Sequence, residues 1–456
     1  MNSKVCAVAL CLNTLCSATA SMDNAGNARF LNYARQPTGF DLHTQAALSG
    51  IAQLTPQPVL HHAPSLDQYL KEYVTSPEVA DAFHVIDVQP LIQRYHDWKT
   101  HLPAIQPYYA VKVNPDPVIV ASLMGMGTGF DCASISEIKQ ILSYGATPDR
   151  ILFAHTRKPA QDIRTAYQLG VRKMTFDSIE ELEKMVTAAP EGQYILRIKV
   201  DDSHSANPLG SKFGATLEEA KNILEYAKKN RLDIAGVSFH VGSNCHDENT
   251  FVAAIQDAAT ILSIGKRHYG FSMQWFALGG GWPGDDVAGF VRITEAVNQQ
   301  ITKIPDYETL HLVAEPGRYF STPTMTIGMR LIGKRLIKNS AGQMKAEYYL
   351  SNGIYGFFMS SLYYQYDARS LKEEGWKFEP FQKNPAAQQI LTRLWGPTCD
   401  SGDKIIDDLV LPEMKTGDFL LARDMGAYTN ALATQFNQIT PSHVYYVLST
   451  AQLEKS

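Results

Sequence analysis

The chain has 456 residues, with 45% hydrophobic and 19% charged side chains and a formal net charge of −5. These values are typical of a globular protein of two or three domains, and they exclude collagen-like and low-complexity chains. No basic stripe favours nucleic acid or an anionic membrane surface as a partner, and no apolar run approaches the roughly 20 residues of a membrane span. Six unevenly placed cysteines give neither a disulfide framework nor a metal-ligand spacing, so we expect a cytoplasmic protein without a metal.

Residues 1–45 are predicted to be a leader or a disordered segment. Lys4 precedes an apolar stretch over 5–12, and residues 18–20 have the small-x-small pattern of a signal-peptide cleavage site. The apolar stretch is short and interrupted, so an extension before an alternative start at Met22 is the other interpretation. We leave this segment out of the fold prediction.

The next part of the chain alternates strand and helix patterns. Runs rich in β-branched and aromatic residues occur at Tyr108–Val113, Thr128–Ala133, Ile151–Ala154, Lys173–Phe176, Tyr194–Val200, Ile234–Val241, Met273–Leu278 and His311–Ala314. Helical patterns such as 135–144 and 216–230 separate them, which predicts parallel strands with crossover helices. Eight such units predict a (β/α)8 TIM-like barrel over residues 89–322, with a doubly wound open sheet as the competing topology.

Residues 323–456 show a different pattern, in which strand follows strand without intervening helices. The predicted strands lie at Thr324–Ile337, Ala346–Leu350, Asp418–Leu421 and His443–Leu448, with turn signals between them. This pattern predicts a mostly antiparallel β domain. Residues 46–88 end in one more strand, at Phe83–Val88, and we expect this N-terminal segment to join the β domain. The predicted fold class is therefore α/β, a barrel followed by a β domain.

Polar residues collect where the barrel strands are predicted to end. They are Lys112, Asp131, Ser134, His155, Asp177, Arg197, His240, the run Gly279-Gly280-Gly281, and Glu315 with Arg318. Each has an ordinary structural explanation when taken singly. The active site of a (β/α)8 barrel lies at the carboxyl ends of its strands, so their joint occurrence there indicates a catalytic site.

The chemistry of these side chains favours one cofactor. A lysine among apolar residues is desolvated, so we expect the pKa of Lys112 to fall and its amine to form a Schiff base. The Gly279–Gly281 backbone, Ser243 and Arg318 can form a phosphate cradle. An aldehyde that also carries a phosphate and a pyridine is pyridoxal 5′-phosphate, and Glu315 is the candidate partner of the ring nitrogen. A simple aldolase would also use a lysine and a phosphate site, but it would not need that carboxylate.

Several motifs occur together in one order along residues 80–450. They are PYYAVK at 107–112, GFDCAS at 129–134, FHVGS at 239–243, AEPGRY at 314–319, WGPTCD at 395–400, and GAYT at 426–429 with Phe436-Asn437. In these motifs the chain resembles the eukaryotic ornithine decarboxylases, which are fold-type III pyridoxal-phosphate enzymes. The resemblance implies a carboxy-lyase that acts on an amino acid and works as a homodimer with shared active sites, without a nucleic-acid or membrane partner.

The resemblance also implies roles for individual residues. Lys112 would be the Schiff-base lysine, and Cys399 from the partner subunit would protonate the carbon that loses carbon dioxide. The implied catalytic residues are Lys112, Cys399, His240 and Glu315. The implied cofactor-binding residues are Lys112, Asp131, Arg197, His240 (stacked on the ring), Ser243, Gly279, Gly280, Gly281, Glu315, Arg318 and Tyr428, with Glu137 in support. The implied substrate-binding residues are Asp400, Tyr355, Tyr364 and Phe436, of which Asp400 and Tyr355 would cross the dimer interface.

The chain departs from the family pattern at the substrate end. Tyr364 stands where the family has the second carboxylate that holds the far ammonium of ornithine, although a shifted alignment would let Asp367 substitute. Ala277 and Asn352 also replace aspartates, and Ala-His-Thr-Arg-Lys at 154–158 replaces the usual Ala-Asn-Pro-Cys-Lys. Fewer carboxylates and an added arginine suggest a substrate whose far end is less cationic than that of ornithine or carries its own carboxylate. The ornithine-decarboxylase-like enzyme of fungal loline alkaloid pathways is a relative of this kind.

The sequence therefore predicts pyridoxal-phosphate-dependent α-decarboxylation of a basic or diamino acid, with a substrate other than ornithine in secondary metabolism. Three alternatives stay open. The first is an ordinary ornithine decarboxylase that makes putrescine and has drifted around its substrate site. The second is an inactive regulator like the antizyme inhibitors, which the presence of the cofactor-binding residues disfavours. The third is a racemase, which would need a second base opposite Lys112. The sequence offers no better candidate than Cys399, and a thiol there fits protonation after decarboxylation.

Overall fold

The computed structural model describes residues 40–338, 341–364, 375–382, 384–439 and 442–450, without the side chains of Tyr363 and Tyr364. The chain divides into two units between Thr38 and Gly39, and all described residues belong to the second unit. Most of the segment that we predicted as a leader lies outside the described residues. Its last residues do not, because helix α1 (Leu42–Ile51) begins there with Asp41 as its N-cap. The expected leader is therefore too long at its C-terminal end.

The middle of the chain forms the predicted closed barrel. Within residues 106–314, eight parallel strands pair in the order β11-β12-β3-β4-β5-β6-β7-β9, and β9 closes the barrel onto β11. The strands are β3 (Gln106–Ala110), β4 (Gly129–Cys132), β5 (Ile151–Phe153), β6 (Lys173–Phe176), β7 (Gln193–Arg197), β9 (Gly236–Ser238), β11 (Trp275–Ala277) and β12 (His311–Ala314). Their central residues are buried on both faces, as expected for strands covered by helices.

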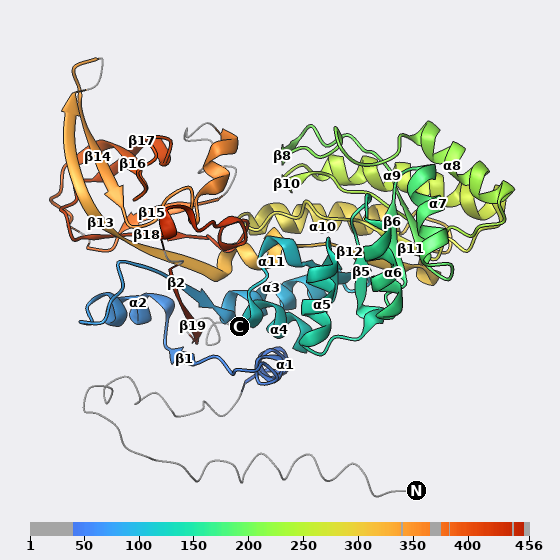
Figure 1. Cartoon of the computed structure of the whole chain (residues 1–456), viewed down its shortest axis with the longest axis horizontal. Helices are drawn as coiled ribbons and strands as arrows, with labels where there is room; N and C mark the ends of the chain where they lie inside the picture. The colour runs from blue at the N-terminus through green and yellow to red at the C-terminus, as the bar shows by residue number, and fades with distance from the viewer. Residues whose placement is uncertain (1–39, 339–340, 365–374, 383, 440–441, 451–456) are drawn as a thin grey trace, which may run out of the picture. The chain divides into compact units, whose positions relative to one another are not determined.

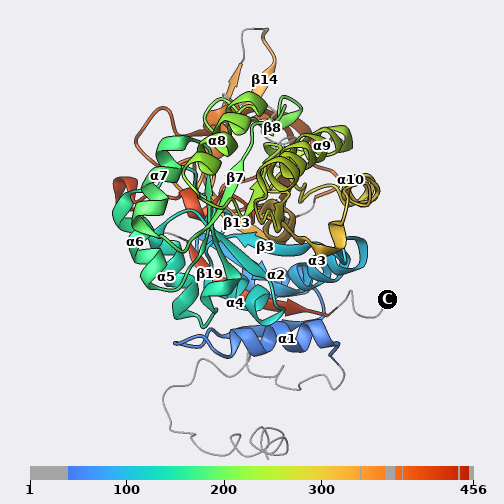
Figure 2. The same cartoon turned by 90° about the vertical axis from the view of Figure 1, so that its right-hand side faces the viewer.

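Helices surround the barrel strands, as Figure 2 shows. They are α3 (Val88–His101), α4 (Pro117–Gly125), α5 (Ile135–Ser143), α6 (Ala160–Gln168), α7 (Ile179–Ala188), α8 (Leu217–Lys229), α9 (Glu248–Ile264) and α10 (Val287–Ile301). Side chains fix where several of them begin: the Ser134 hydroxyl accepts the N–H of Glu137 at α5, and Thr216 forms a capping box with Glu219 at α8. These caps satisfy backbone N–H groups in the first turn of each helix.

The second sheet is mostly antiparallel, as predicted. In the described part of the chain its path is β1-β19-β2-β13-β14-β16-β17, with β18 on β13 and β15 on β18. Its strands are β1 (Leu60–Ala63), β2 (Ala82–Asp87), β13 (Met325–Lys338), β14 (Met344–Leu350), β15 (Lys377–Pro380), β16 (Gln389–Trp395), β17 (Lys404–Pro412), β18 (Phe419–Arg423) and β19 (His443–Ser449) (Figure 1). Strand β2, from the N-terminal segment, pairs with β13 and β19, so the sheet joins this segment to the C-terminal part of the chain, as predicted.

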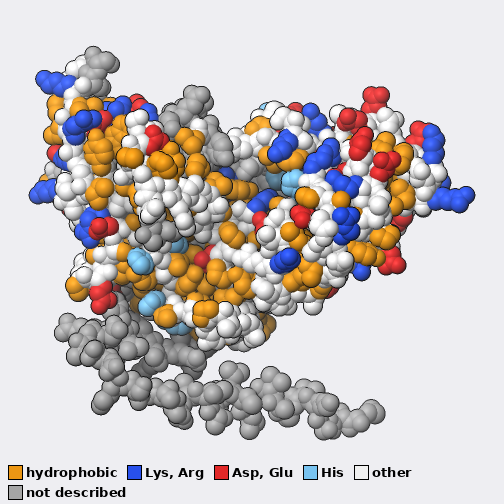
Figure 3. All heavy atoms as spheres, in the orientation of Figure 1, with side chains coloured by type: hydrophobic (Ala, Val, Ile, Leu, Met, Phe, Trp, Pro, Cys, Tyr) orange, Lys and Arg blue, Asp and Glu red, His pale blue; other side chains and the backbone are white. Residues whose placement is uncertain are grey.

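Short elements complete the described structure. They include α2 (Leu66–Val74), α11 (Arg318–Ser321) and a separate two-stranded antiparallel sheet of β8 (Ser205–Asn207) and β10 (Ser243–Cys245). No helix of the described residues has both the length and the apolar content needed to span a membrane. On the face shown in Figure 3, acidic and basic side chains are interspersed rather than separated into patches of one sign.

Candidate active site

Lys112 lies just beyond the barrel strand that was predicted to contain it. Strand β3 ends at Ala110, and Val111–Val113 form a 3-10 turn at the carboxyl end of the barrel. The Lys112 ammonium donates to the carboxylate of Asp131 in β4, which is 1% exposed. Tyr428 from the β domain donates its N–H to the carbonyl of Val113, 3.0 Å away, and so ties the turn from the other side.

The environment of Lys112 corrects the expected direction of its pKa. Burial alone would lower the pKa, but the negative charge of Asp131, with contributions from Tyr428 and Glu315, raises it above its usual value. The amine is therefore held as an ammonium ion beside Asp131. A Schiff base needs the neutral amine, so Lys112 must release this proton before it reacts.

Ser243, Arg318 and Tyr428, which were predicted to hold a phosphate, lie together. The Arg318 Nε donates to the Ser243 hydroxyl over 2.8 Å, and the Arg318 guanidinium lies 4.7 Å from the centre of the Tyr428 ring. Tyr428 has a left-handed backbone (φ +55°), a strained conformation for a residue with a bulky side chain. Gly280 and Gly281 line the same pocket. A Cβ atom at Gly280 would lie 2.5 Å from Nε2 of His240, so only glycine permits this close approach.

Gly279 supports the cradle from behind rather than lining it. Its φ is +61°, and its carbonyl accepts the N–H of Glu315 at 2.7 Å and the indole N–H of Trp282 at 3.0 Å. A Cβ atom on Gly279 would lie 2.0 Å from the carbonyl oxygen of Phe239. Through this hydrogen bond to Glu315 and the close contact with Phe239, Gly279 joins the end of β11 to the end of β12 and to the loop after β9.

Two buried groups give the pocket its electrostatic character. Burial raises the pKa of Glu315 to about 8, with Asp131 adding to the rise and Lys112 and Arg197 opposing it. Burial also keeps the pKa of His240 well below its usual value, and Arg197 and Lys112 push it the same way. His240 is therefore a neutral ring, and its Nδ1 accepts the N–H of Gly242 at 3.1 Å. A protonated group next to Glu315 would stabilise its charged carboxylate form, which burial disfavours.

A cavity of about 480 Å³ opens above Lys112. Its walls combine charged, polar and apolar groups. The lining residues are Lys112, Ala133, Ala154, His155, Thr156, Arg197, Asn207, Leu209, Phe213, His240, Ser243, Glu315, Arg318, Ser360, Tyr428 and Leu432. This volume is large enough for a cofactor and an amino acid together.

The three residues predicted to come from a partner, Tyr355, Cys399 and Asp400, lie together with Phe436 in a second cluster, which we call the Cys399 cluster. The Tyr355 hydroxyl donates to Asp400 over 2.5 Å, and the rings of Tyr355 and Phe436 lie 4.4 Å apart. Cys399 is exposed, and its N–H and thiol both donate to Oδ1 of Asn437, at 3.1 and 3.4 Å. No member of the cluster lines either described cavity at Lys112.

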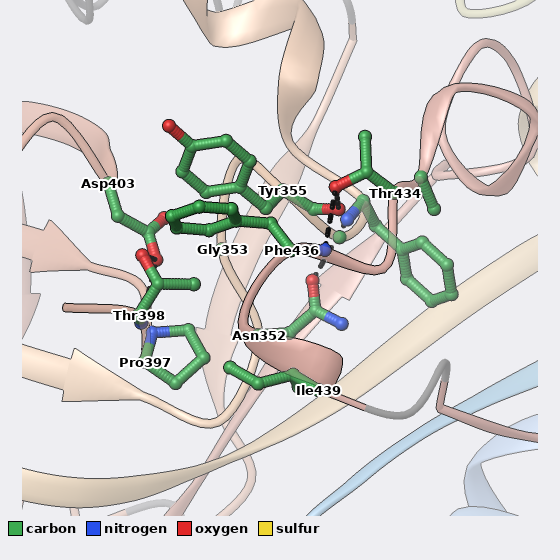
Figure 4. A pocket seen from close by; sticks show the side chains of 12 residues that line it. Asn352, Gly353, Tyr355, Pro397, Thr398, Asp403, Thr434, Phe436 and Ile439 are labelled. Carbon is green, nitrogen blue, oxygen red and sulfur yellow. Dashed lines mark hydrogen bonds between the residues drawn. The ribbon is translucent and has the colours of Figure 1, made fainter. Parts of the chain in front are cut away.

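A buried carboxylate holds the Cys399 cluster together. Asp403 accepts hydrogen bonds from the N–H of Ile354 at 2.9 Å, the N–H of Thr398 at 2.9 Å and the Thr398 hydroxyl at 2.7 Å. It thereby joins the loop that carries Tyr355 to the loop that carries Cys399. Figure 4 shows Asp403 and Thr398 pointing toward one another beside a small cavity of about 30 Å³.

Several predicted residues lie elsewhere than at the cavity wall. Asp131 acts through Lys112, and Glu137 accepts the N–H of Ala133 at the start of α5, so it serves the helix. Ala277 is buried inside the barrel. The Tyr364 side chain and all of Asp367 lie outside the described residues.

Sequence reasoning missed part of the wall. Leu209 and Phe213 come from the loop after β7, which carries no motif signal, and Ser360 comes from the 3-10 helix Met359–Tyr364. Asp403 was not singled out either, although it follows the WGPTCD motif by three residues.

The residues present fit pyridoxal phosphate. The cradle pairs a guanidinium with hydroxyl donors and side-chain-free backbone, which suits a phosphate dianion. Lys112 offers an amine for the aldehyde, and Glu315 is a buried carboxyl group to which no described side chain donates a hydrogen bond. A protonated ring nitrogen would relieve the cost of its burial.

Comparison with known proteins identifies one family. Residues 88–322 match the family model described as "Pyridoxal-dependent decarboxylase, pyridoxal binding domain". The chain is 38% identical over 396 residues to the ornithine decarboxylase of Rattus norvegicus, covering 84% of each chain. It is 35% identical over 390 residues to antizyme inhibitor 2 of Xenopus laevis, covering 83% of each. The structure of the Paramecium bursaria Chlorella virus arginine decarboxylase bound to agmatine has a TM-score of 0.77 at 31% identity, covering 84% of this chain and all of that one.

Barrel, β domain and lysine pocket together define a fold-type III amino-acid decarboxylase, a carboxy-lyase that depends on pyridoxal phosphate. Within that class, the extent of the sequence identity settles the branch. The chain belongs to the eukaryotic ornithine decarboxylase family.

Proposed function

We propose that this enzyme removes the α-carboxylate from an ornithine-like amino acid whose far end is not the primary ammonium of ornithine. One observation carries the proposal: among the described residues that line the Lys112 cavity, Glu315 is the sole carboxylate, and the cofactor ring would engage it. A buried ammonium that loses one charge partner is destabilised by about 2–5 kcal/mol, or about 30- to several-thousand-fold in affinity.

The relatives support a fold that accepts different far ends. The rat relative is named for ornithine, whereas the viral structure is an arginine decarboxylase bound to agmatine. The far end of the substrate is therefore decided by individual wall residues rather than by the barrel. A role in secondary metabolism, including alkaloid synthesis, stays a prediction, as does a cytoplasmic location.

The roles of the residues follow from their positions. When bound, pyridoxal phosphate supplies an aldehyde for an amino group and a ring that takes up the electron pair released with carbon dioxide. Ser243, Arg318, Tyr428 and the glycine backbone would hold its phosphate, and Lys112 would carry its aldehyde. Glu315 would keep a proton at the ring nitrogen, and the neutral imidazole of His240 would stack on the ring.

After carbon dioxide leaves, the former α-carbon needs a proton, and we infer that its donor comes from a second copy of the chain. The Cys399 thiol is a proton donor, yet it does not line the cavity of its own chain. We propose a homodimer in which the Cys399 cluster of each copy completes the Lys112 cavity of the other. Cys399 would then protonate the former α-carbon, and Asp400 would face the far end of the substrate.

The test is carbon dioxide release from the purified holoenzyme with a panel of L-amino acids, including ornithine, lysine, arginine and longer-tailed analogues. We expect a higher kcat/KM on an amino acid without a terminal primary ammonium. A clear preference for ornithine would instead establish the alternative, an ornithine decarboxylase that makes putrescine. No visible absorption and no carbon dioxide from any amino acid would indicate a regulator like the antizyme inhibitor.

A further inference from the structure

Two hydroxyl groups on the wall of the Lys112 cavity lack a partner within the described part of the chain. Thr156 and Ser360 are each 1% exposed, and neither Oγ1 of Thr156 nor Oγ of Ser360 makes a hydrogen bond there. Both residues line the cavity. A buried polar atom without a hydrogen bond is costly, so unsatisfied atoms at a cavity wall indicate contacts with a ligand.

The two hydroxyls come from different parts of the fold but serve one cavity. Thr156 follows β5 of the barrel, in the run at 154–158 where the chain departs from the family pattern. Ser360 lies in the 3-10 helix Met359–Tyr364, which also contains the position of the missing carboxylate. The two segments in which the chain departs from the family pattern, 154–158 and 359–364, therefore both contribute a residue to the wall of the Lys112 cavity.

His155 adds a third uncharged group to this wall. Its Nδ1 accepts the N–H of Arg157 at 3.0 Å, which assigns the ring proton to Nε2. Burial lowers the pKa of His155, and Lys158 lowers it further. The imidazole, which lines the cavity and packs edge-on against Phe213, is therefore a neutral donor through Nε2.

The cations next to His155 are neutralised elsewhere. Arg157 donates to the carboxylate of Asp177 and does not line the cavity. Lys158 is fully buried, 3.0 Å from Glu181, and its ammonium donates to the His155 and Thr175 carbonyls. The arginine that the sequence suggested as a partner for a substrate carboxylate thus has its own carboxylate already.

We propose that His155, Thr156 and Ser360 recognise the far end of the substrate, and that this end is a neutral hydrogen-bonding group such as an amide, a ureido group or a hydroxyl. The inference rests on the proposed function and names its substrate class. A neutral acceptor can take the His155 proton and exchange hydrogen bonds with both hydroxyls. An ammonium ion would leave water without gaining a charge partner from these three side chains, and the Asp400 that the proposed dimer brings to the far end would be the single carboxylate there.

The experiment compares the holoenzyme with two variants and two matched controls. Thr156→Val and Ser360→Ala remove the lining hydroxyls. Thr128→Val and Ser361→Ala remove hydroxyls that are equally buried and unpartnered but do not line the cavity. Each protein is assayed for carbon dioxide release from L-citrulline (ureido), L-ornithine (ammonium) and L-2-aminoadipate (carboxylate), with visible absorption and thermal unfolding as checks on cofactor binding and folding.

We expect wild-type enzyme to prefer L-citrulline. Each lining variant should lose about 5-fold in kcat/KM on L-citrulline relative to its matched control, mainly through KM, with the visible absorption unchanged. Ornithine as the best wild-type substrate would refute the proposed function itself. A preference for L-2-aminoadipate, or a preference for L-citrulline that neither lining variant reduces beyond the controls, would refute the neutral-group inference and leave the proposed function standing. Where a variant does not fold, the wild-type order of L-ornithine, L-citrulline and L-2-aminoadipate still tests the proposed function and the neutral-group inference.

Discussion

The lysine pocket and the Cys399 cluster are built in opposite ways. The pocket lies at the ends of barrel strands, where Asp131, Glu315 and Arg318 are each less than 9% exposed and are fixed by strand pairing and close glycine contacts. The cluster lies on loops of the β domain, with Cys399 exposed and Phe436 42% exposed. The comparison teaches that the cofactor-pocket side chains are fixed within one chain, whereas the Cys399 cluster of that chain does not line its Lys112 cavity. The proposed homodimer would bring the two together.

The largest expected effect concerns the pocket alone. Lys112→Ala removes the amine that would carry the cofactor, so carbon dioxide release should fall by about 10³-fold or more, the scale seen when an enzyme loses its nucleophile. The visible absorption of the purified protein should disappear as well. Lys229→Ala, which removes an exposed lysine on α8, is the matched control and should change neither quantity. An absorbing, active Lys112→Ala protein would contradict the pocket assignment.

The second prediction tests whether the two halves come from different copies. Cys399→Ala should keep the absorption, lower amine formation by about 10²-fold and raise the share of a carbonyl side product per carbon dioxide released, since the carbon lacks its proton donor. Mixing Cys399→Ala with Lys112→Ala should restore activity, because half of the random dimers then contain one intact site, giving about a quarter of the wild-type rate. If the cluster served its own chain, mixing would restore nothing.

The same division explains what could be predicted from the sequence. The fold and the pocket were predictable because strand periodicity is local and because barrel topology brings the strand ends to one rim, as for Lys112, Arg197 and Glu315. The pKa of Lys112 was predicted in the wrong direction, because the neighbour that decides it, Asp131, lies on the adjacent strand and its ion pair is a tertiary contact. Ser360 and Phe213 were missed because they reach the cavity from irregular segments, whose paths depend on packing rather than on periodicity.

A third, smaller effect concerns how the Cys399 cluster is held. Asp403→Asn replaces a carboxylate that accepts from the N–H groups of Ile354 and Thr398 with an amide that offers a donor to one of them. We expect a loss of about 1–3 kcal/mol in stability and about a 10-fold loss in kcat, with unchanged visible absorption. Asp408→Asn, at a 65% exposed carboxylate of β17, is the control and should have little effect. Loss of visible absorption in Asp403→Asn would mean that cofactor binding in the lysine pocket depends on the Cys399 cluster.

The last effect leaves catalysis aside and is a pH-dependent stability that the lysine pocket should have. Burial raises the pKa of Glu315 from 4.5 to about 8, so between these values the cofactor-free native state holds a proton that the unfolded chain has released. Unfolding then releases a proton, and the free energy of unfolding falls as pH rises from about 5 to 8. Glu315→Gln lacks this titration, so its Tm relative to wild type should rise over the same interval in thermal scans of cofactor-free protein. Glu225→Gln, at an exposed carboxylate of α8, should give a flat difference. A flat difference for Glu315→Gln would mean that the carboxyl group is already paired, and the site would then have no need of a protonated ring nitrogen.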